Sequence, residues 1–242
     1  MQIISDERED FKALNARINA VKDREIALHG CMGQRYIACG LSDKRLEIFG
    51  VAGNALGAYL NGAEIFINGN AQDAVGDTMN DGLIVVRGNA GDATGYSMRG
   101  GKIYVSGNIG YRAGIHMKEY GEHKPTIVVG GRAGSFLGEY QAGGIIAVLG
   151  MHEDGLPIIN NFCGTGMHGG AIYLRCDKLP KKLPEQVQYK KIKGYSDGVL
   201  KSAVEDFCKY FKEFESEKIL NSDFFILTPN TSNPYKQMYT DN

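Results

Sequence analysis

The chain lacks most features of exported, membrane-bound and nucleic-acid-binding proteins. Its five cysteines are odd in number and never occur as C-x-x-C, which favours free thiols in a reducing cytoplasm. No apolar run approaches about 18 residues and no hydrophobic leader is present, so we expect neither membrane insertion nor export. The formal net charge of −1 gives no reason to expect a nucleic-acid or membrane surface.

The chain also lacks the motifs that carry most enzyme chemistry. Its five histidines form neither H-x-x-x-H nor H-E-x-x-H, so we expect surface histidines rather than a metal site. Its glycine-rich runs do not end in Gly-Lys-Ser or Gly-Lys-Thr, as a phosphate-binding loop does. Cys163 and His168 come nearest to a thiol–imidazole pair, but spacing fixes no Asn or Asp beside them. We therefore predict no catalytic, cofactor-binding or metal-binding residue.

What the chain does have is glycine, 33 residues of it, and much of that glycine is periodic. From Gly50 to Gly150 a G-x-x-G-x-x-x-G pattern recurs every nineteen residues, with Gln72 in place of one middle glycine. Internal repetition at such a period indicates a solenoid. We predict a structural glycine ladder made of Gly50, Gly53, Gly57, Gly69, Gly76, Gly88, Gly91, Gly95, Gly107, Gly110, Gly114, Gly131, Gly134, Gly138, Gly150 and Gly164.

Apolar columns in the same period predict one strand in each repeat. Two columns spaced by two residues indicate a half-buried strand. A methionine column lies ten residues after the opening glycine, and we expect it in the core rather than at a cofactor. The pattern predicts an all-β core, a parallel β-helix of about seven turns. The columns are Ile65, Ile84, Ile103, Ile127, Ile146 and Ile172; Ile67, Val86, Val105, Val129, Val148 and Leu174; and Met79, Met98, Met117 and Met167.

The glycines and an asparagine column are expected to form the corners of this structure. Sharp corners need residues with positive φ, which glycine adopts without the roughly 1–2 kcal/mol that a Cβ costs. Asn70, Asn89 and Asn108 follow the opening glycines, and stacked amides of this kind can hydrogen-bond along the axis.

Departures from the period predict loops and end structures. The repeat is interrupted at Glu119–His123 and within His152–Asn160, where we expect projecting loops. Apolar residues at helical spacing predict helices over 6–21, with Ser5 as cap, and over 197–220, which would cover the two ends. The predicted domains are an N-terminal helical cap (1–23), the repeat domain (24–176), and a linker, C-terminal helix and extended tail (177–242).

The motif series resembles a known family. The stretches Gly69–Asn80 and Gly95–Gly101 are similar to the GXGXG domain, the C-terminal right-handed β-helix of the glutamate synthase large subunit. The resemblance covers residues from about 24 to 176, and Gly110–Tyr120 is more similar to the stand-alone version of split synthases. The related β-helical subunit of the tungsten or molybdenum formylmethanofuran dehydrogenases is similar as well. The resemblance implies a right-handed, single-stranded parallel β-helix with terminal helical caps.

The resemblance implies a supporting role in glutamate biosynthesis. In glutamate synthases, glutaminase and FMN/iron–sulfur domains transfer glutamine-derived ammonia to 2-oxoglutarate, and the GXGXG domain braces them. Here Met1 is followed by Gln2, so no N-terminal nucleophilic cysteine is present, nor is an iron–sulfur cysteine cluster. The implied function is a non-catalytic scaffold subunit without a cofactor of its own. FMN and the iron–sulfur cluster are expected on partners, namely a glutaminase-type amidotransferase subunit and an FMN/iron–sulfur synthase subunit.

Other functions stay open at this point. The chain could instead be the β-helical component of a formylmethanofuran dehydrogenase-like complex, which a molybdopterin partner would reveal. A stand-alone β-helix enzyme acting on carbohydrate is a further alternative, but clustered surface carboxylates and an export signal are not evident. Assembly into a homo-oligomer also stays open. Partner contacts are expected at the two interruptions and at the helical ends.

Overall fold

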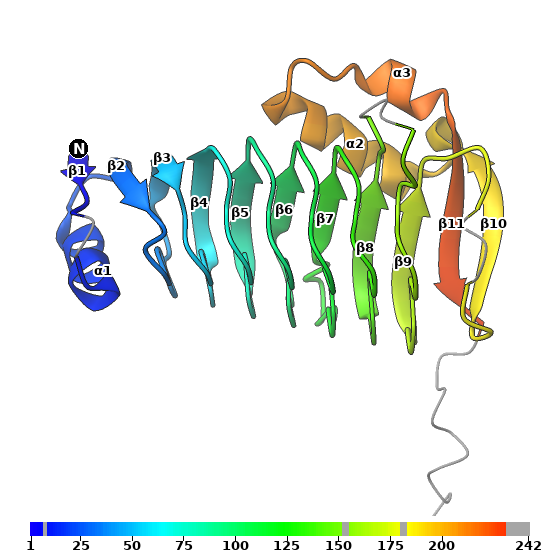
Figure 1. Ribbon diagram of the computed structural model, residues 1–242, viewed down its shortest axis with the longest axis horizontal. Helices are drawn as coiled ribbons and strands as arrows, with labels where there is room; N and C mark the ends of the chain where they lie inside the picture. Colours follow the sequence, from blue (N-terminus) through cyan, green and yellow to red (C-terminus); the bar gives the residue numbers. More distant parts are fainter. Residues whose placement is uncertain (7–8, 152–154, 180–182, 231–242) are drawn as a thin grey trace, which may run out of the picture.

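The core of the molecule is one large sheet. In the computed structural model, which describes residues 1–6, 9–151, 155–179 and 183–230, eleven strands pair in the order β1-β2-β3-β4-β5-β6-β7-β8-β9-β11-β10 (Figure 1). The strands are β1 (Gln2–Ile4), β2 (Glu25–Met32), β3 (Arg45–Val51), β4 (Asn61–Asn68), β5 (Asp81–Val86), β6 (Lys102–Val105), β7 (Thr126–Val129), β8 (Ala142–Val148), β9 (Gly169–Leu174), β10 (Val187–Lys193) and β11 (Asp223–Pro229).

The predicted fold class is wrong. The sequence predicts a right-handed, single-stranded parallel β-helix of about seven turns with terminal helical caps. The described residues instead form a mixed, mostly parallel sheet with few helices. Strands β1 to β9 pair in parallel, whereas β11 pairs antiparallel with both β9 and β10. The antiparallel strands come from segments expected to be a linker and a tail. Phe224 and Leu227 of β11 are fully buried, which gives that segment a reason to join the sheet.

The predicted apolar columns are confirmed as neighbours in the sheet. From β4 to β9, the isoleucines of the first column pair in register, and so do the residues of the second column. Both columns are fully buried, as are the four methionines of the third. Gln141 occupies the methionine position of its repeat and is also fully buried. Its amide nitrogen donates to the carbonyls of Gly143 and Gly144, at 3.2 and 3.1 Å.

The first helix lies beside the N-terminal strands. Helix α1 (Phe11–Ala20) buries Leu14 and Ile18, and Figure 1 shows it next to β1, β2 and β3. Its N-cap is Asp10, whose carboxylate accepts the N–H of Lys12, so the expected cap Ser5 is wrong. Asn15 ties the helix to the first repeat, because its side chain accepts the N–H of Ala38 at 2.9 Å.

The C-terminal helices cover a face of the sheet instead of its end. The predicted helix over 197–220 is two helices, α2 (Gly198–Tyr210) and α3 (Ser216–Leu220), preceded by the 3-10 turn η1 (Gly194–Ser196). Figure 1 shows both helices along one side of the sheet. They bury Leu200, Val204 and Phe207 against outward-facing strand residues that include Val85 and Tyr104. These strands are therefore apolar on both faces, because each face is covered.

Three donors bind Asp206 of α2, and two of them, Lys102 and Tyr104 of β6, hold the helix on the sheet. Its carboxylate accepts from Lys102 Nζ at 2.6 Å, from the Tyr104 hydroxyl at 2.7 Å and from Lys209 Nζ at 2.9 Å. Burial alone would raise the pKa of Asp206, but these three donors outweigh it and lower the pKa to about 2.

No helix of the described residues has both the length and the apolar character needed to cross a bilayer.

Asp206 should make the stability of the fold depend on acidity. Its pKa lies below the ordinary 3.8, so its stabilising effect is present above about pH 4 and is lost as pH falls toward 2. The stability deficit of Asp206→Asn, measured by urea unfolding, should be largest at neutral pH and should shrink between pH 4 and 2. Glu205→Gln, an exposed carboxylate on the same helix, is the control. A deficit that stays constant with pH would contradict this account.

The turn glycines are set by packing more than by their backbone angle. The third glycine of each repeat has φ between +64° and +72°. Residues two positions before and after it are also left-handed, with φ between +50° and +62°, yet they carry side chains such as those of Ala93 and Ser97. A Cβ on Gly95 would lie 2.5 Å from Ile127 Cδ1 of the next repeat, and Gly57 and Gly76 face Ile84 and Ile103 in the same way. Positive φ, the reason expected from the sequence, is therefore only part of the explanation.

Several glycines of the first two columns make room for a row of side-chain acceptors. Asn70 Oδ1 accepts the N–H of Asn89, and Asn89 Oδ1 accepts the N–H of Asn108, both at 2.8 Å. Asp73 and Asp92, three residues after these asparagines, accept backbone N–H groups of the next repeat in the same way. A Cβ on the glycine before each acceptor's partner would overlap the acceptor oxygen. The asparagines thus bond along the axis as expected, but to backbone N–H groups and not to one another.

Replacing Gly95 tests this packing explanation. Gly95→Ala should lower the free energy of unfolding by more than the roughly 1–2 kcal/mol that a left-handed φ costs alone. Gly40→Ala is the matched control, because Gly40 has φ +66° and open space around a Cβ. Ile127→Val removes the Cδ1 that the added methyl group would meet, so the Gly95→Ala loss should be smaller in that background. Equal losses at both glycines in urea unfolding would contradict the explanation.

Candidate functional site

The described residues do not assemble the chemistry of a nucleophilic enzyme. Cys163 is buried, and burial raises the pKa of its thiol to about 12, which disfavours the thiolate. His168 Nδ1 lies 3.2 Å from the carbonyl oxygen of Gly166. Within the ranges that the structure describes, no three His, Cys, Asp or Glu side chains gather as metal ligands would.

The main surface feature is a series of exposed and half-buried aromatic rings in the turn segments, which we call the aromatic edge. The rings come from successive repeats, and several stack on their neighbours. His116 stacks on Tyr140 with centroids 5.2 Å apart, and Phe136 stacks on Phe162 at 4.8 Å. Arg112 lies over the Phe136 ring at 5.1 Å. The aromatic edge comprises Tyr36, Tyr59, Tyr96, His116, Phe136, Tyr140 and Phe162.

Most residues of the aromatic edge have a strained backbone. Tyr36, Tyr59, Phe136 and Phe162 have φ between +55° and +62°, where a bulky residue is an outlier. At the same places in other repeats the chain has residues such as Ala55, Ser97 and Arg112, so the fold does not require an aromatic ring there. Tyr59 and Phe162 are 55% and 54% exposed. Exposed rings held at a conformational cost indicate a binding role.

The structure describes the first predicted loop completely and the second only in part. Glu119–His123 is confirmed as a loop, and its Tyr120 and His123 exchange two backbone hydrogen bonds of 3.1 and 3.0 Å. Of the second interruption, residues 152–154 lie outside the described part of the chain. Ile159 is buried and forms a bridge with Ala133, so this stretch returns to the stack of repeats.

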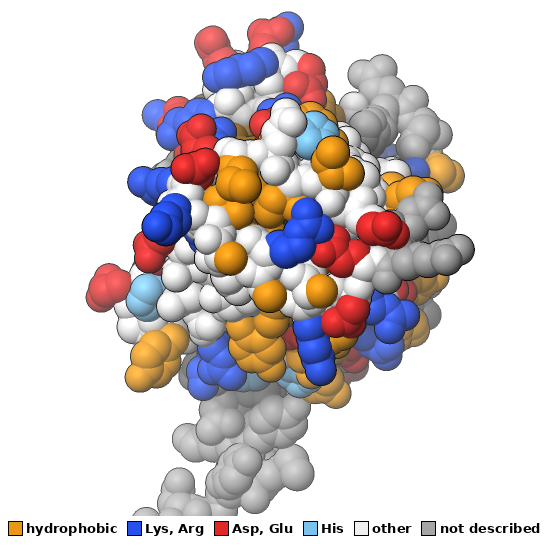
Figure 2. Space-filling view, turned by 90° about the vertical axis from the view of Figure 1, so that its left-hand side faces the viewer, with side chains coloured by type: hydrophobic (Ala, Val, Ile, Leu, Met, Phe, Trp, Pro, Cys, Tyr) orange, Lys and Arg blue, Asp and Glu red, His pale blue; other side chains and the backbone are white. Residues whose placement is uncertain are grey.

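The N-terminal end carries a smaller apolar surface. Ile4 and Met32 are 71% and 67% exposed, and the ring of Phe49 stacks on His29 with centroids 4.5 Å apart. Figure 2 looks onto this end, where hydrophobic side chains lie between charged ones of both signs. The mixed charge gives no preference for a strongly acidic or basic partner.

Comparison with known proteins settles the family. Residues 4–229 match the GXGXG motif family. The chain belongs to this family. It is also 42% identical to Uncharacterized protein MJ1350 of Methanocaldococcus jannaschii over 242 residues, which cover 95% of this chain and 93% of that protein. The resemblance seen in the motifs is thus confirmed at the level of the family, while the predicted division into 1–23, 24–176 and 177–242 stays a prediction.

The predicted glycines of this GXGXG protein all lie in or beside the turns between strands, in three columns. Glycines of the third column, such as Gly95, face a core isoleucine of the next repeat, whereas glycines of the first two columns, such as Gly69 and Gly91, lie against the preceding repeat. The aromatic edge was not predicted from the sequence, because all its residues except Tyr96 occur at two turn positions whose residue varies from repeat to repeat. Aromatic residues recurring at those two positions are the signal that could have revealed it.

Replacing an edge residue tests whether the rings serve folding. Tyr59→Asn should change the free energy of unfolding by less than about 1 kcal/mol, since Asn tolerates the left-handed conformation better than Tyr. Chemical denaturation of the variant, with Ala55→Gly as the control for the neighbouring left-handed position, gives the comparison. A loss above about 2 kcal/mol would assign Tyr59 to the core.

Proposed function

We propose that this chain is a non-catalytic scaffold subunit of a multi-subunit glutamate synthase-like complex. In this proposal it braces a glutaminase-type amidotransferase subunit against an FMN/iron–sulfur synthase subunit. The observation that carries the proposal is the aromatic edge, a series of exposed and half-buried rings, most of them on left-handed backbone that recurs in each repeat. Membership of the GXGXG family supplies the glutamate synthase context.

The physical properties of the aromatic edge suit a protein partner. Tyr, Phe and Arg are enriched in protein interfaces, where rigid rings lose little entropy on binding. The stacked pairs Phe136–Phe162 and His116–Tyr140 restrict one another before any partner arrives. Arg112 is fixed over Phe136 by its ion pair with Glu139, with 3.1 Å between Nε and Oε2. A preorganised surface of this kind binds at a smaller entropic cost.

The chemistry is assigned to the partners in this proposal. FMN and the iron–sulfur cluster would be held by the synthase subunit, and glutamine hydrolysis by the amidotransferase subunit. The cysteines of this chain give little support for a redox role. Burial, the largest influence on each, raises the pKa values of Cys31, Cys176 and Cys208 to about 11. Such thiols are poor nucleophiles and poor ligands at neutral pH.

Affinity purification of the tagged chain from its native host tests the proposal. We expect it to recover a glutaminase-type subunit together with a flavin- and iron–sulfur-containing subunit. Phe162→Ser should weaken recovery by roughly tenfold or more, as loss of an interface anchor does. Tyr189→Ser, an exposed tyrosine on β10 away from the edge, should leave recovery unchanged.

Two results would overturn this proposal. Isolation of the chain without either partner, at native abundance, would contradict a scaffold role. Recovery of a molybdopterin-containing partner would replace the glutamate synthase-like assignment with the formylmethanofuran dehydrogenase type.

A further inference from the structure

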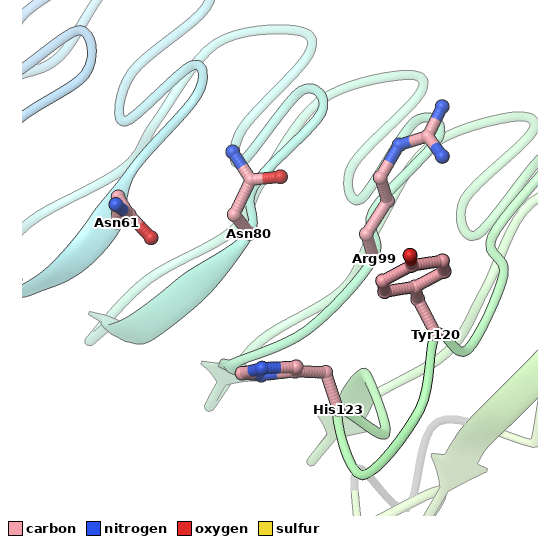
Figure 3. A pocket seen from close by; sticks show the side chains of 5 residues that line it. All are labelled: Asn61, Asn80, Arg99, Tyr120 and His123. Carbon is pink, nitrogen blue, oxygen red and sulfur yellow. The ribbon is translucent and has the colours of Figure 1, made fainter.

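A polar pocket lies where the first loop folds back over the repeats. Asn61, Asn80 and Arg99 occupy the same position in three consecutive repeats, and Tyr120 and His123 come from the loop. Figure 3 shows the three repeat residues side by side, with the loop residues beneath Arg99. The pocket encloses about 330 Å³, near the lower end of ligand sites, which span roughly 300–1,000 Å³.

The five polar side chains that line this pocket are all exposed. Among the described residues, none of their side-chain nitrogen or oxygen atoms has a hydrogen-bond or ion-pair partner. Other polar side chains of the repeats behave differently: Asn70 and Asn89 each accept a backbone N–H at 2.8 Å. Water therefore satisfies these groups in the free protein, and a ligand in the hollow would replace that water.

The loop that closes the pocket is fixed in place. Tyr120 and His123 bond to each other through their backbones, as described above. Glu119 Oε2 accepts the N–H of Gly144 at 3.1 Å, which ties the loop to the following repeat. His123 also packs against Gly100, where an added Cβ would lie 3.1 Å from the His123 Cβ. The pocket is therefore largely preformed, which lowers the entropic cost of filling it.

The lining groups select an anion. The guanidinium of Arg99, the amides of Asn61 and Asn80 and the Tyr120 hydroxyl can all donate hydrogen bonds. None of the lining side chains is acidic. The nearby carboxylates of Glu119 and Asp81 keep their negative charge, but each directs an oxygen at a backbone N–H, that of Gly144 at 3.1 Å and that of Gly82 at 2.8 Å. Glu122 is exposed at the loop tip, outside the lining.

We propose that this pocket binds a small carboxylate, with Arg99 as its principal partner. The planar guanidinium matches a carboxylate in a two-pronged geometry, and the asparagine amides supply further neutral donors. The size of the pocket favours a mono- or dicarboxylic acid of about ten non-hydrogen atoms or fewer. This assignment is independent of the scaffold role.

The site is tested by titrating the full chain with succinate at low salt. Binding is measured by calorimetry and by the NMR shifts of the Tyr120 and His123 amides. We expect saturable binding that Arg99→Gln weakens by roughly tenfold or more, the effect of losing a charged hydrogen-bond partner. Arg35→Gln, an exposed arginine outside the pocket, should change binding by less than about twofold. Succinamide, which has the same shape without the charge, should not bind.

These measurements distinguish a specific carboxylate site from non-specific electrostatic binding of anions. Absence of succinate binding overturns the proposal, as does equal weakening by Arg35→Gln, equal binding of succinamide, or tighter binding of inorganic phosphate. Arg99→Gln should melt at the same temperature as the parent chain, because Arg99 has no side-chain partner among the described residues. Loss of partner recovery in Arg99→Gln without any succinate binding would assign Arg99 to the subunit interface instead.

Discussion

Each isoleucine of the first apolar column lies in close contact with the turn of the preceding repeat, and this contact sets how the repeats stack. Ile84, Ile103 and Ile127 each extend their Cδ1 atoms to the place where a Cβ of the earlier turn glycine would be. The strands can stack in register only if that glycine has no side chain, since buried interiors tolerate little overlap. The register of β4 to β9, the full burial of the columns and the positions of the turns all depend on this contact.

The fold was predictable where the chain is periodic and not where an element occurs once. The isoleucine, valine and methionine columns could be found because each recurs at a fixed spacing and is buried in every repeat. Strands β10 and β11 occur once each, so no repetition revealed that Phe224 and Leu227 extend the sheet in antiparallel fashion. The position of α2 was missed for a related reason. The helix packs on strand residues that lie between the two core columns in sequence, such as Val85 and Tyr104. These residues differ from repeat to repeat, so the sequence pattern did not indicate that they are buried.

The candidate site could be predicted only in part. The loop at Glu119–His123 followed from a break in the period, but the pocket it forms with Arg99 did not. That pocket depends on the loop folding back toward earlier repeats, a direction that spacing does not encode. The glycine columns, in contrast, were found from sequence although their physical reason was only partly understood. Left-handed backbone occurs at Ala93 and Ser97 as well, and packing explains why Gly95 alone must lack a side chain.

Each turn therefore contains two classes of left-handed position with different freedom to vary. The inward position is glycine from Gly57 onward, because the next repeat fills the space beside it, and alanine (Ala38) in the first repeat. The outward positions on either side of it accept residues as different as Ala55, Arg112 and Phe136. The backbone path is the same whichever residue stands outside, so a substitution there alters the surface without altering the core. A stack of turns with the same backbone path can in this way present side chains that differ from repeat to repeat.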